Sequence, residues 1–451
     1  MAFWITWRAR PVPARWMRAK GVLARNPRLD SVFTMATTTE AELPGTAPAE
    51  SHDAGRGDAR AWTVVAILGW AQSVLGAMMP MHFILGGLAG NLLAPDPILA
   101  TLPISVVVIA AMASAPILSG FMGRYGRRAG FLVAAIAGMV GLWLASVAIG
   151  ERSFGLFLGG SALIGLYMAG HNFYRFAAAD AASPSFRPRA ISLVMAGGLA
   201  AALIGPEVVQ GWTDWLEPVP YAGAYRAMMV VAAIGTIPLL FLDIPPAHHE
   251  ATEDTPRRSL REILSERRIG VAMICAMVAY ALMNLMMTAT PLAMAACGFG
   301  THEAAGVVQG HVLAMYAPSF ITGSLIARFG APRIIALGLI CFAVAASAAF
   351  SGITLAHFYV ALITLGLGWN FAFIGATAML TEATRPEERA RVQGLNDFAV
   401  MALVSLGSLS SGVLLAIAGW GAVQVAMVPM VVLAAAALLW LSLREGRAAM
   451  G

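Results

Sequence analysis

The chain has little charge. Asp, Glu, Lys and Arg together make up 12% of its 451 residues, whereas about a quarter of an average soluble domain is charged. Lysine is nearly absent, because Lys20 is its single occurrence, and hydrophobic residues reach 59%. The composition therefore excludes an ordinary soluble protein and predicts a polytopic membrane protein within a lipid bilayer.

Cysteine and enzyme motifs are also scarce. The cysteines lie in or beside apolar runs and lack metal-ligand or paired spacing, which indicates packing residues: Cys275, Cys297 and Cys341. His302 and Glu303 begin like a zinc-protease helix, but Gly306 occupies the position of the second histidine. The sequence has no Gly-x-Ser-x-Gly elbow and no Gly-Lys-Ser phosphate loop. We therefore predict no enzyme activity, no catalytic residues, no metal and no cofactor.

The net charge of +5 and the pI near 9.4 could suggest a nucleic acid partner. The basic residues are, however, scattered singly between apolar runs instead of forming one polar face, so no nucleic acid partner is expected.

Seventeen arginines lie in the even-numbered connections and the tail, against two in or beside the odd-numbered connections. The positive-inside rule then predicts that both termini are cytoplasmic. The lack of lysine suggests a GC-rich bacterial genome, so the bacterial inner membrane is the expected location.

Twelve apolar runs have about the 20-residue length that a helix needs to cross a bilayer. They predict an all-α integral membrane protein with twelve transmembrane helices, at residues 62–90, 98–122, 129–149, 154–178, 190–212, 222–243, 269–296, 304–327, 332–352, 355–380, 392–417 and 419–442.

Two pairs of loops repeat along the chain. The first pair is offset by 203 residues (323 − 120) and shares a glycine and arginine pattern: Gly120, Arg124, Gly126, Arg127 and Arg128 against Gly323, Arg328, Gly330 and Arg333. The second pair is offset by 202 residues (382 − 180): Asp180, Pro184, Arg187 and Arg189 against Glu382, Pro386, Arg389 and Arg391. Loops that repeat in register predict two pseudo-symmetric six-helix bundles.

The expected organisation has five parts: a disordered segment 1–61, a first bundle 62–243, a cytoplasmic linker 244–268, a second bundle 269–443 and a cytoplasmic tail 444–451. Within the linker, Ser259 and Glu262 have the spacing of a capping box, which predicts a short amphipathic helix on the membrane surface. Met35 opens a polar, Pro-containing stretch, and we expect it to be the physiological start of translation.

The loop 120–128 resembles the signature loop that the major facilitator superfamily has between its second and third helices. Five positions match: Gly120, Arg124, Gly126, Arg127 and Arg128. Gly123 occupies the position of the family's acidic residue, so this loop lacks the carboxylate of the usual gating interaction. The twelve-span layout is similar to the family over residues 62–442. The resemblance implies alternating access, in which two helical bundles rock around a central site.

In the family, the loop acid helps to latch the two halves together. We hypothesise that Asp397, near the start of span eleven, replaces it as the partner of Arg124 or Arg175. The alternative, that Asp397 faces the central cavity, has equal weight. Asp180 and Glu382 lie at the inner ends of spans four and ten, where pairing with nearby arginines is favoured over substrate binding.

The resemblance also implies a cavity lined by spans one, four, seven and ten. The residues it selects offer amide hydrogen bonds, an aromatic face and cationic groups: Gln72, His171, Asn172, Arg175, Asn284, Trp369 and Asn370. His171 and Arg175 are four residues apart and are expected on one helical face. Such a site fits a small organic solute with polar edges. Hydrogen bonding between helices is an equally good explanation for each Asn or Gln.

Glu207 follows Gly205 and Pro206 in span five, a context that resembles an antiporter-associated pattern of the family. A carboxylate inside a bilayer can exchange a proton near neutral pH, so Glu207 is a candidate for proton coupling together with Asp397. The alternative is a hydrogen-bonded carboxylate near the outer surface, since Asp214 follows one to two turns later.

We therefore predict a monomeric, proton-coupled secondary transporter for a small organic solute. The Gly205-Pro206 element favours drug-like efflux slightly, and uptake of a vitamin such as riboflavin has comparable weight. A transporter-shaped sensor or membrane scaffold, which binds a solute without moving it, is the competing class.

Overall fold

The computed structural model describes residues 50–183, 186–244, 259–385 and 388–448. Residues 53–451 form one compact unit, and the described residues contain helices and loops but no strand. The predicted disordered segment 1–61 is wrong for residues 50–61, because α2 begins at Glu50. Residues 1–49 with the start at Met35, the loop prolines Pro184 and Pro386, and linker residues 245–258 lie outside the described residues.

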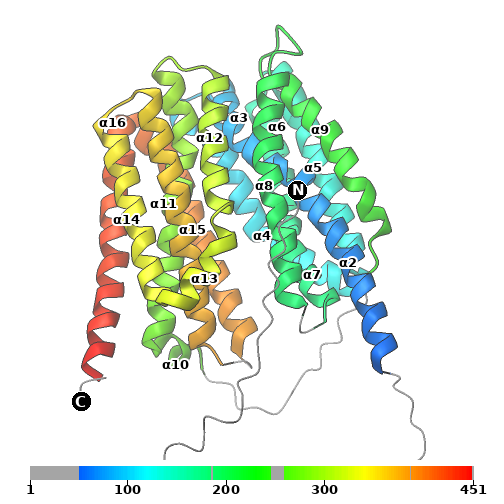
Figure 1. The fold of residues 1–451 in the computed structure, drawn as a ribbon. Helices are drawn as coiled ribbons and strands as arrows, with labels where there is room; N and C mark the ends of the chain where they lie inside the picture. Colours follow the sequence, from blue (N-terminus) through cyan, green and yellow to red (C-terminus); the bar gives the residue numbers. More distant parts are fainter. Residues whose placement is uncertain (1–49, 184–185, 245–258, 386–387, 449–451) are drawn as a thin grey trace, which may run out of the picture. The chain divides into compact units, whose positions relative to one another are not determined.

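The helices of the first repeat are α2 (Glu50–Val74), η2 (Leu75–Ala77), α3 (Met78–Leu93), η3 (Pro97–Leu99), α4 (Leu102–Tyr125), α5 (Arg127–Gly150), α6 (Phe154–His171), α7 (Tyr174–Ala181), α8 (Arg187–Trp212), α9 (Ala222–Thr236) and η4 (Ile237–Phe241). The second repeat contains α10 (Leu260–Ser265), α11 (Arg267–Ala296), α12 (Thr301–Tyr316), α13 (Ser319–Phe329), α14 (Ala331–Ser351), α15 (Leu355–Ala383) and α16 (Arg389–Ala448). Figure 1 shows their arrangement.

Ten helices in the described part of the chain are long and apolar enough to cross a membrane, or eleven if α12 and α13, which meet at 41°, form one span. The all-helical membrane fold is thus confirmed. α16 contains both of the last two predicted spans, and its helical conformation is interrupted at Gly419, where φ is 75°.

The two repeated loops have the same backbone conformation. Gly126 has φ 86° and ψ 158°, and Gly330 has φ 82° and ψ 148°. Glycine adopts positive φ without steric cost, so the turn between α4 and α5 and the turn between α13 and α14 are equally tight. The arginine before each turn lies over the next aromatic ring, at 5.5 Å for Arg124 on Tyr125 and 5.3 Å for Arg328 on the ring of residue 329. The two loops thus share a backbone conformation as well as a sequence pattern.

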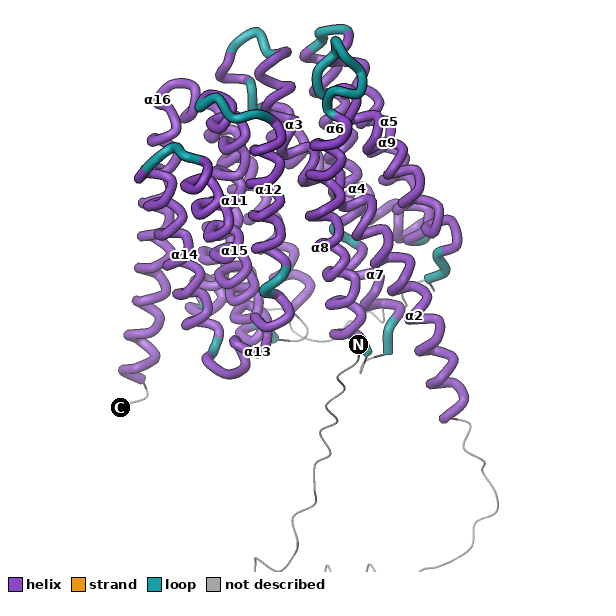
Figure 2. Tube along the Cα trace, turned by 45° about the horizontal axis from the view of Figure 1, so that its top comes forward, coloured by secondary structure: helices purple, strands orange, loops and turns teal. Residues whose placement is uncertain are grey.

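Helices from the two repeats pack against each other most extensively in three pairs: α3 with α11, α8 with α12, and α4 with α16. At the first pair, a Cβ on Gly87 would lie 3.4 Å from the Leu292 side chain. At the second, a Cβ on Gly198 would lie 3.1 Å from the Tyr316 ring. Glycine thus lets these helices approach closely, as in other membrane helix pairs. Figure 2 shows the same helices from a second direction.

The predicted linker helix is present as α10. The Ser259 side chain accepts a hydrogen bond from the Glu262 backbone N–H, and the Glu262 carboxylate accepts one from the Ser259 backbone N–H. This is the capping box expected from the sequence. Ile263 is fully buried and Leu264 is half exposed, so one apolar side chain anchors this short helix on the protein.

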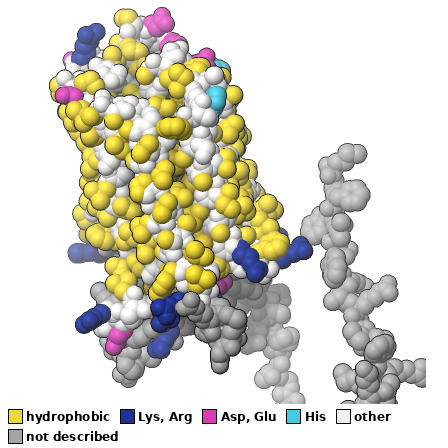
Figure 3. All heavy atoms as spheres, turned by 90° about the vertical axis from the view of Figure 1, so that its left-hand side faces the viewer, with side chains coloured by type: hydrophobic (Ala, Val, Ile, Leu, Met, Phe, Trp, Pro, Cys, Tyr) yellow, Lys and Arg dark blue, Asp and Glu magenta, His cyan; other side chains and the backbone are white. Residues whose placement is uncertain are grey.

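The surface that carries α14 and α16 is apolar over most of its height, with arginine side chains gathered mostly at one end (Figure 3). Its exposed residues include Ile340, Val432 and Leu439, each about 60% exposed. Long apolar side chains on a helix exterior, bounded by arginines, are typical of a lipid-facing surface.

Candidate functional site

A cavity of about 110 Å³ lies between helices of the two repeats. Its lining comes from η2, α3, α4, α6 and α8 of the first repeat and from α11, α12 and α16 of the second. The lining residues are Gly76, Met79, Pro80, Phe83, Val108, Met168, His171, Asn172, Gly198, Ala201, Tyr280, Met283, Asn284, Met287, Val312, Met315, Tyr316 and Val404. A site shared by both repeats can change its exposure when the repeats move relative to each other.

Three interruptions of helical structure border this cavity. The α-helix changes to a 3₁₀ turn at η2, which includes Gly76, and α6 ends at His171 before α7 begins at Tyr174. The third interruption separates α12 from α13 beyond Tyr316. Broken helices at the middle of a membrane protein are characteristic of transporter binding sites, because irregular backbone is tolerated only where protein or a cavity surrounds it.

His171 and Asn172 line the cavity at the end of α6. A turn at residues 172 and 173 separates His171 at the end of α6 from Arg175 in α7, and Arg175 lies within electrostatic range of the imidazole. A Cβ on Gly76 would lie 3.1 Å from Nε2 of His171. Glycine at position 76 thus makes room for the imidazole, whose Nε2 has no hydrogen-bond partner among the described residues.

α11 presents one face to the cavity through Tyr280, Met283, Asn284 and Met287. Their spacing of three, four and seven residues is that of one helical face. Asn284 is 1% exposed, and its Oδ1 accepts a hydrogen bond of 3.4 Å from the Thr288 hydroxyl. This bond leaves the Nδ2 group of Asn284 as a donor with no partner in the described part of the chain.

Methionine is the commonest residue type of the lining, at positions 79, 168, 283, 287 and 315. Its unbranched side chain has three rotatable bonds and a polarizable sulfur, so it adapts to ligand shape and contacts aromatic rings favourably. The cavity therefore combines adaptable apolar walls with a few amide, imidazole and phenol groups.

Trp369 does not line the cavity, contrary to the prediction. Its ring stacks on Phe373 with centroids 5.1 Å apart and meets Tyr280 edge-on at 5.6 Å. Tyr280 and Tyr316, which contact Trp369, are the aromatic residues that reach the cavity from this side. α15 therefore supports the lining from behind, and α12 takes the place that the sequence assigned to span ten.

Asn370 is fully buried and also lies outside the lining. Its Nδ2 donates to the carbonyl of Met315 and to the hydroxyl of Ser319, and its Oδ1 accepts from Thr322, at 2.6 to 2.7 Å. These bonds hold the break between α12 and α13, where Pro318 offers no backbone N–H. For Asn370, helix-to-helix hydrogen bonding is thus the interpretation that the geometry supports.

Gln72 is buried at the contact of α2 with α8, where a Cβ added to Gly197 would lie 3.0 Å from the Cβ of Gln72. It is not part of the lining. Of the residues predicted for the cavity, His171, Asn172 and Asn284 line it, and the remaining four are not among its lining residues.

Arg175 of α7 lies within electrostatic range of side chains from both repeats: Asp397 on α16, Tyr280 on α11 and Tyr316 on α12. No ion pair within 4.0 Å joins Arg175 to Asp397 among the described residues, and Asp397 is exposed. The Nε group of Arg175 is buried without a hydrogen-bond partner there, and its guanidinium carbon lies 4.7 Å from the Phe176 ring. A charged group so placed is rare in a membrane interior, which makes Arg175 a candidate functional residue.

Asp180 forms an ion pair with Arg127, with the two side chains 32% and 25% exposed. The predicted pairing of Asp180 with an arginine is thus confirmed, and it links the end of α7 to the start of α5. Glu382, its counterpart in the second repeat, is exposed and lies within electrostatic range of Arg268, which itself hydrogen-bonds Glu445 at 2.6 Å. The two repeats thus use their matching acids differently.

Glu207 of α8 has an exposed side chain and is not part of the lining. The premise of a buried carboxylate at this position is therefore wrong. Gly205, its neighbour, has a packing role, because a Cβ there would lie 2.7 Å from the carbonyl oxygen of Ala77. The close contact of α8 with η2 therefore accounts for glycine at position 205, so this residue gives no support to efflux over uptake.

Comparisons with known proteins agree with this architecture. A sequence profile of the Major Facilitator Superfamily matches residues 61–319 and, in a second match, residues 272–449. The Riboflavin transporter RfnT of Brucella anthropi is 39% identical over 387 residues, which cover 85% of this chain and 97% of that protein. The uncharacterized MFS-type transporter YddS of Bacillus subtilis is 28% identical over 347 residues, covering 72% of this chain and 80% of that protein.

Solved structures share the fold. The nucleoside transporter NupG has a TM-score of 0.61 at 16% identity, covering 84% of this chain and 98% of that one. The xylose transporter XylE of E. coli, in a partially occluded inward open conformation, has a TM-score of 0.63 at 13% identity, covering 84% and 96%. At such identities the likeness shows the fold alone.

Proposed function

Because this chain belongs to the Major Facilitator Superfamily and is a secondary transporter, we propose that its solute is riboflavin, carried across the inner membrane of a bacterium. The observation that carries this substrate is the 39% identity with the Riboflavin transporter RfnT over 97% of that protein. The other relative and both structural neighbours named above are also transporters.

The chemistry of the cavity supports a flat heterocycle. Riboflavin has a planar ring system with apolar faces and an imide edge of two carbonyls and one N–H. Tyr280 and Tyr316 offer aromatic faces or edges to such a ring. The free Nδ2 donor of Asn284 and the amide of Asn172 suit the carbonyls and the N–H of the imide edge.

The cavity of about 110 Å³ is smaller than the roughly 300 Å³ at which drug-sized ligand pockets begin. Solute entry must therefore displace lining side chains or part the repeats. The methionines of the lining can change rotamer at low cost. We interpret the structure as a state narrower than the one that holds the solute.

We further propose twelve spans in two six-helix bundles, 62–243 and 269–443, with both termini in the cytoplasm. The break of α16 at Gly419 supports a division of that helix into two spans, and the bent pair α12 and α13 supports one span at residues 301–329. The arginine-rich loops at Gly126 and Gly330 then lie on the cytoplasmic side. A monomer is sufficient, since one chain supplies every wall of the cavity.

For proton coupling we propose Asp397 in preference to Glu207. Asp397 lies within electrostatic range of Arg175 across the two repeats, so protonation of its carboxylate would change an attraction between them. Neither carboxylate is among the lining residues of the cavity, so the preference rests on the interaction of Asp397 with Arg175. Asp397→Asn should leave solute binding intact and make uptake insensitive to an imposed proton gradient, whereas Glu207→Gln should keep that sensitivity.

The proposed substrate is tested by expressing the chain in a bacterium that cannot synthesise riboflavin. Radiolabelled riboflavin should accumulate in these cells and not in cells that carry an empty vector, and growth at low riboflavin should be restored. Excess unlabelled riboflavin should abolish accumulation, while xylose or uridine should not. Equal accumulation with and without the chain would contradict riboflavin import.

A further inference from the structure

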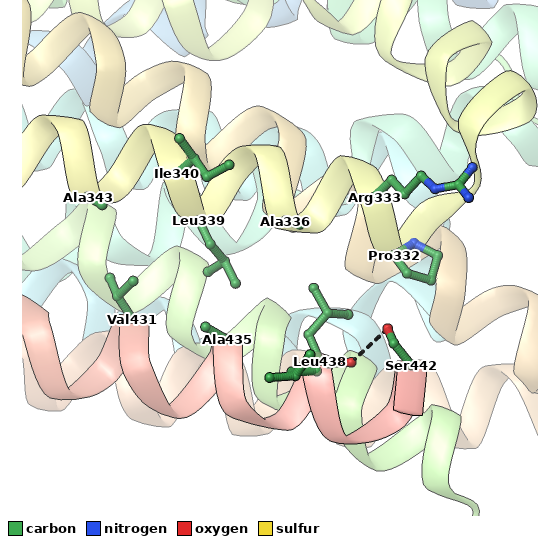
Figure 4. Close-up of a pocket in the computed structure, with 11 residues that line it drawn as sticks. Pro332, Arg333, Ala336, Leu339, Ile340, Ala343, Val431, Ala435, Leu438 and Ser442 are labelled. Carbon is green, nitrogen blue, oxygen red and sulfur yellow. Dashed lines mark hydrogen bonds between the residues drawn. The ribbon is translucent and has the colours of Figure 1, made fainter. Parts of the chain in front are cut away.

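An apolar groove runs between α14 and α16 on the lipid-facing surface, and none of its residues line the central cavity. It encloses about 460 Å³ and is lined by Pro332, Arg333, Ala336, Leu339, Ile340, Ala343, Val431, Ala435, Leu438, Leu439 and Ser442. Figure 4 shows Arg333, Pro332 and Ser442 at one end of the groove and Ala343 and Val431 toward the other. The groove thus has a long apolar part and one polar end.

The polar end carries a single positive charge and no acid among the lining residues. Arg333 lies in the first turn of α14, where the helix dipole adds to its positive potential. Its Nη1 donates to the carbonyl oxygen of Phe329 at 3.4 Å, which holds the side chain near the turn. A guanidinium has five N–H donors, so donors remain for an anion at the mouth of the groove.

We propose that this groove is a binding site for an anionic phospholipid, with an acyl chain along the apolar part and the phosphate on Arg333. The occupant must be apolar over most of its length and negative at one end, and the bilayer around the helices supplies molecules of this kind. Arginine binds phosphate through two parallel N–H bonds. Its position at the end of an apolar run matches the depth of lipid headgroups.

The first repeat contains a groove that serves as an internal comparison. It lies between α5 and α9, encloses about 410 Å³, and is lined by Met139, Val140, Trp143, Met229, Val230 and Ala233. It has a similar size, but none of these lining residues carries a charge. This groove can accept an acyl chain, but it cannot select a negative headgroup.

Native mass spectrometry of the purified full-length protein tests the site, with phosphatidylglycerol and phosphatidylcholine titrated separately. Arg333→Gln should weaken phosphatidylglycerol binding about tenfold, the effect of one charge-assisted contact. It should leave the weaker phosphatidylcholine binding unchanged. Arg333→Lys, which retains the charge, should bind phosphatidylglycerol more tightly than Arg333→Gln. Unchanged phosphatidylglycerol binding by Arg333→Gln would overturn the proposal.

Filling the groove gives a second, independent test. Ala435→Leu adds volume inside the groove and should reduce binding of both lipids, while the matched variant Ala233→Leu fills the comparison groove and should leave selective phosphatidylglycerol binding intact. Equal loss from both variants would show general surface binding and would contradict the site. A dimer peak in the native mass spectrum that disappears in Ala435→Leu would also contradict the proposal, because the groove would then be the contact between two copies of the chain.

Discussion

The hydroxyls of Ser105 on α4 and Ser408 on α16 lie 2.8 Å apart and form a buried hydrogen bond between the two repeats. One turn away, a Cβ on Gly412 would lie 2.1 Å from Oγ1 of Thr101. The two helices therefore meet closely through small residues at the end of α4 opposite the Gly126 turn. Tyr221 and Thr301 also lie near each other at this end of the helices, one from each repeat. These contacts close the repeats together on that side of the cavity.

Gly412→Leu should prevent this closure. Overpacking costs about 1–3 kcal/mol, enough to shift a two-state equilibrium by about fivefold or more. Transport should fall by at least that factor, and a cysteine placed at Ser105 should become accessible to a membrane-impermeant thiol reagent. Gly421→Leu, at a helical glycine with open space around it, is the control and should transport normally. Normal transport by Gly412→Leu would show that α4 and α16 need not approach so closely.

Asn370→Ala should lower stability without changing solute recognition. It removes the bonds to Met315, Ser319 and Thr322, and hydrogen bonds between membrane helices contribute about 0.6 kcal/mol each on average. A loss of about 2 kcal/mol is expected, which thermal unfolding in detergent measures as a lower Tm. Asn91→Ala, at an exposed site, should leave the Tm unchanged. A riboflavin affinity that falls while the Tm stays constant would instead place Asn370 in the binding site.

Asp180→Asn should reduce transport more than Glu382→Gln does, although the two acids match in the repeat. Asp180 has an ion pair with Arg127, and a partly exposed pair is worth about 1 kcal/mol or less. A reduction of about twofold to fivefold is therefore expected. Exchanging the charges in Arg127→Asp with Asp180→Arg should recover part of the lost rate. Equal effects of the two single variants would mean that the repeats work alike at this position.

His171→Phe should weaken riboflavin binding while the fold is retained. The ring lines the cavity and its Nε2 has no partner among the described residues, so replacement by an apolar ring costs no internal hydrogen bond at that nitrogen. Loss of one ligand hydrogen bond should weaken binding about fivefold to tenfold. Quenching of flavin fluorescence measures the affinity, and His357→Phe, in the first turn of α15 and outside the cavity lining, is the control. Unchanged affinity would remove His171 from the recognition site.

The sequence was most informative at the loops. Gly126 and Gly330 have nearly equal positive φ because the same pattern of glycine and arginine occurs twice, and the pattern alone predicted both turns. The pairing of Asp180 with an arginine followed from the cost of a free charge at a membrane helix end. These features depend on local geometry, which a sequence pattern records directly.

The cavity was less predictable, because it depends on how each helix is rotated. Asn284 lies on the cavity lining, and its neighbours Tyr280, Met283 and Met287 could have been found from their common helical face. Nothing in the sequence indicated that Tyr316 of α12 would replace Trp369 and Asn370 of α15 at the cavity wall. The helix break after His171 was also missed, since that segment contains no proline; Pro318 did mark the break between α12 and α13.

Counterflow in proteoliposomes tests the central claim most directly. Vesicles loaded with unlabelled riboflavin and containing the purified protein should take up labelled riboflavin above the equilibrium level, and Asn284→Ala should lose most of this uptake while Asn91→Ala retains it. Binding of riboflavin without any counterflow by the unaltered protein would contradict transport through the cavity and would indicate a solute sensor.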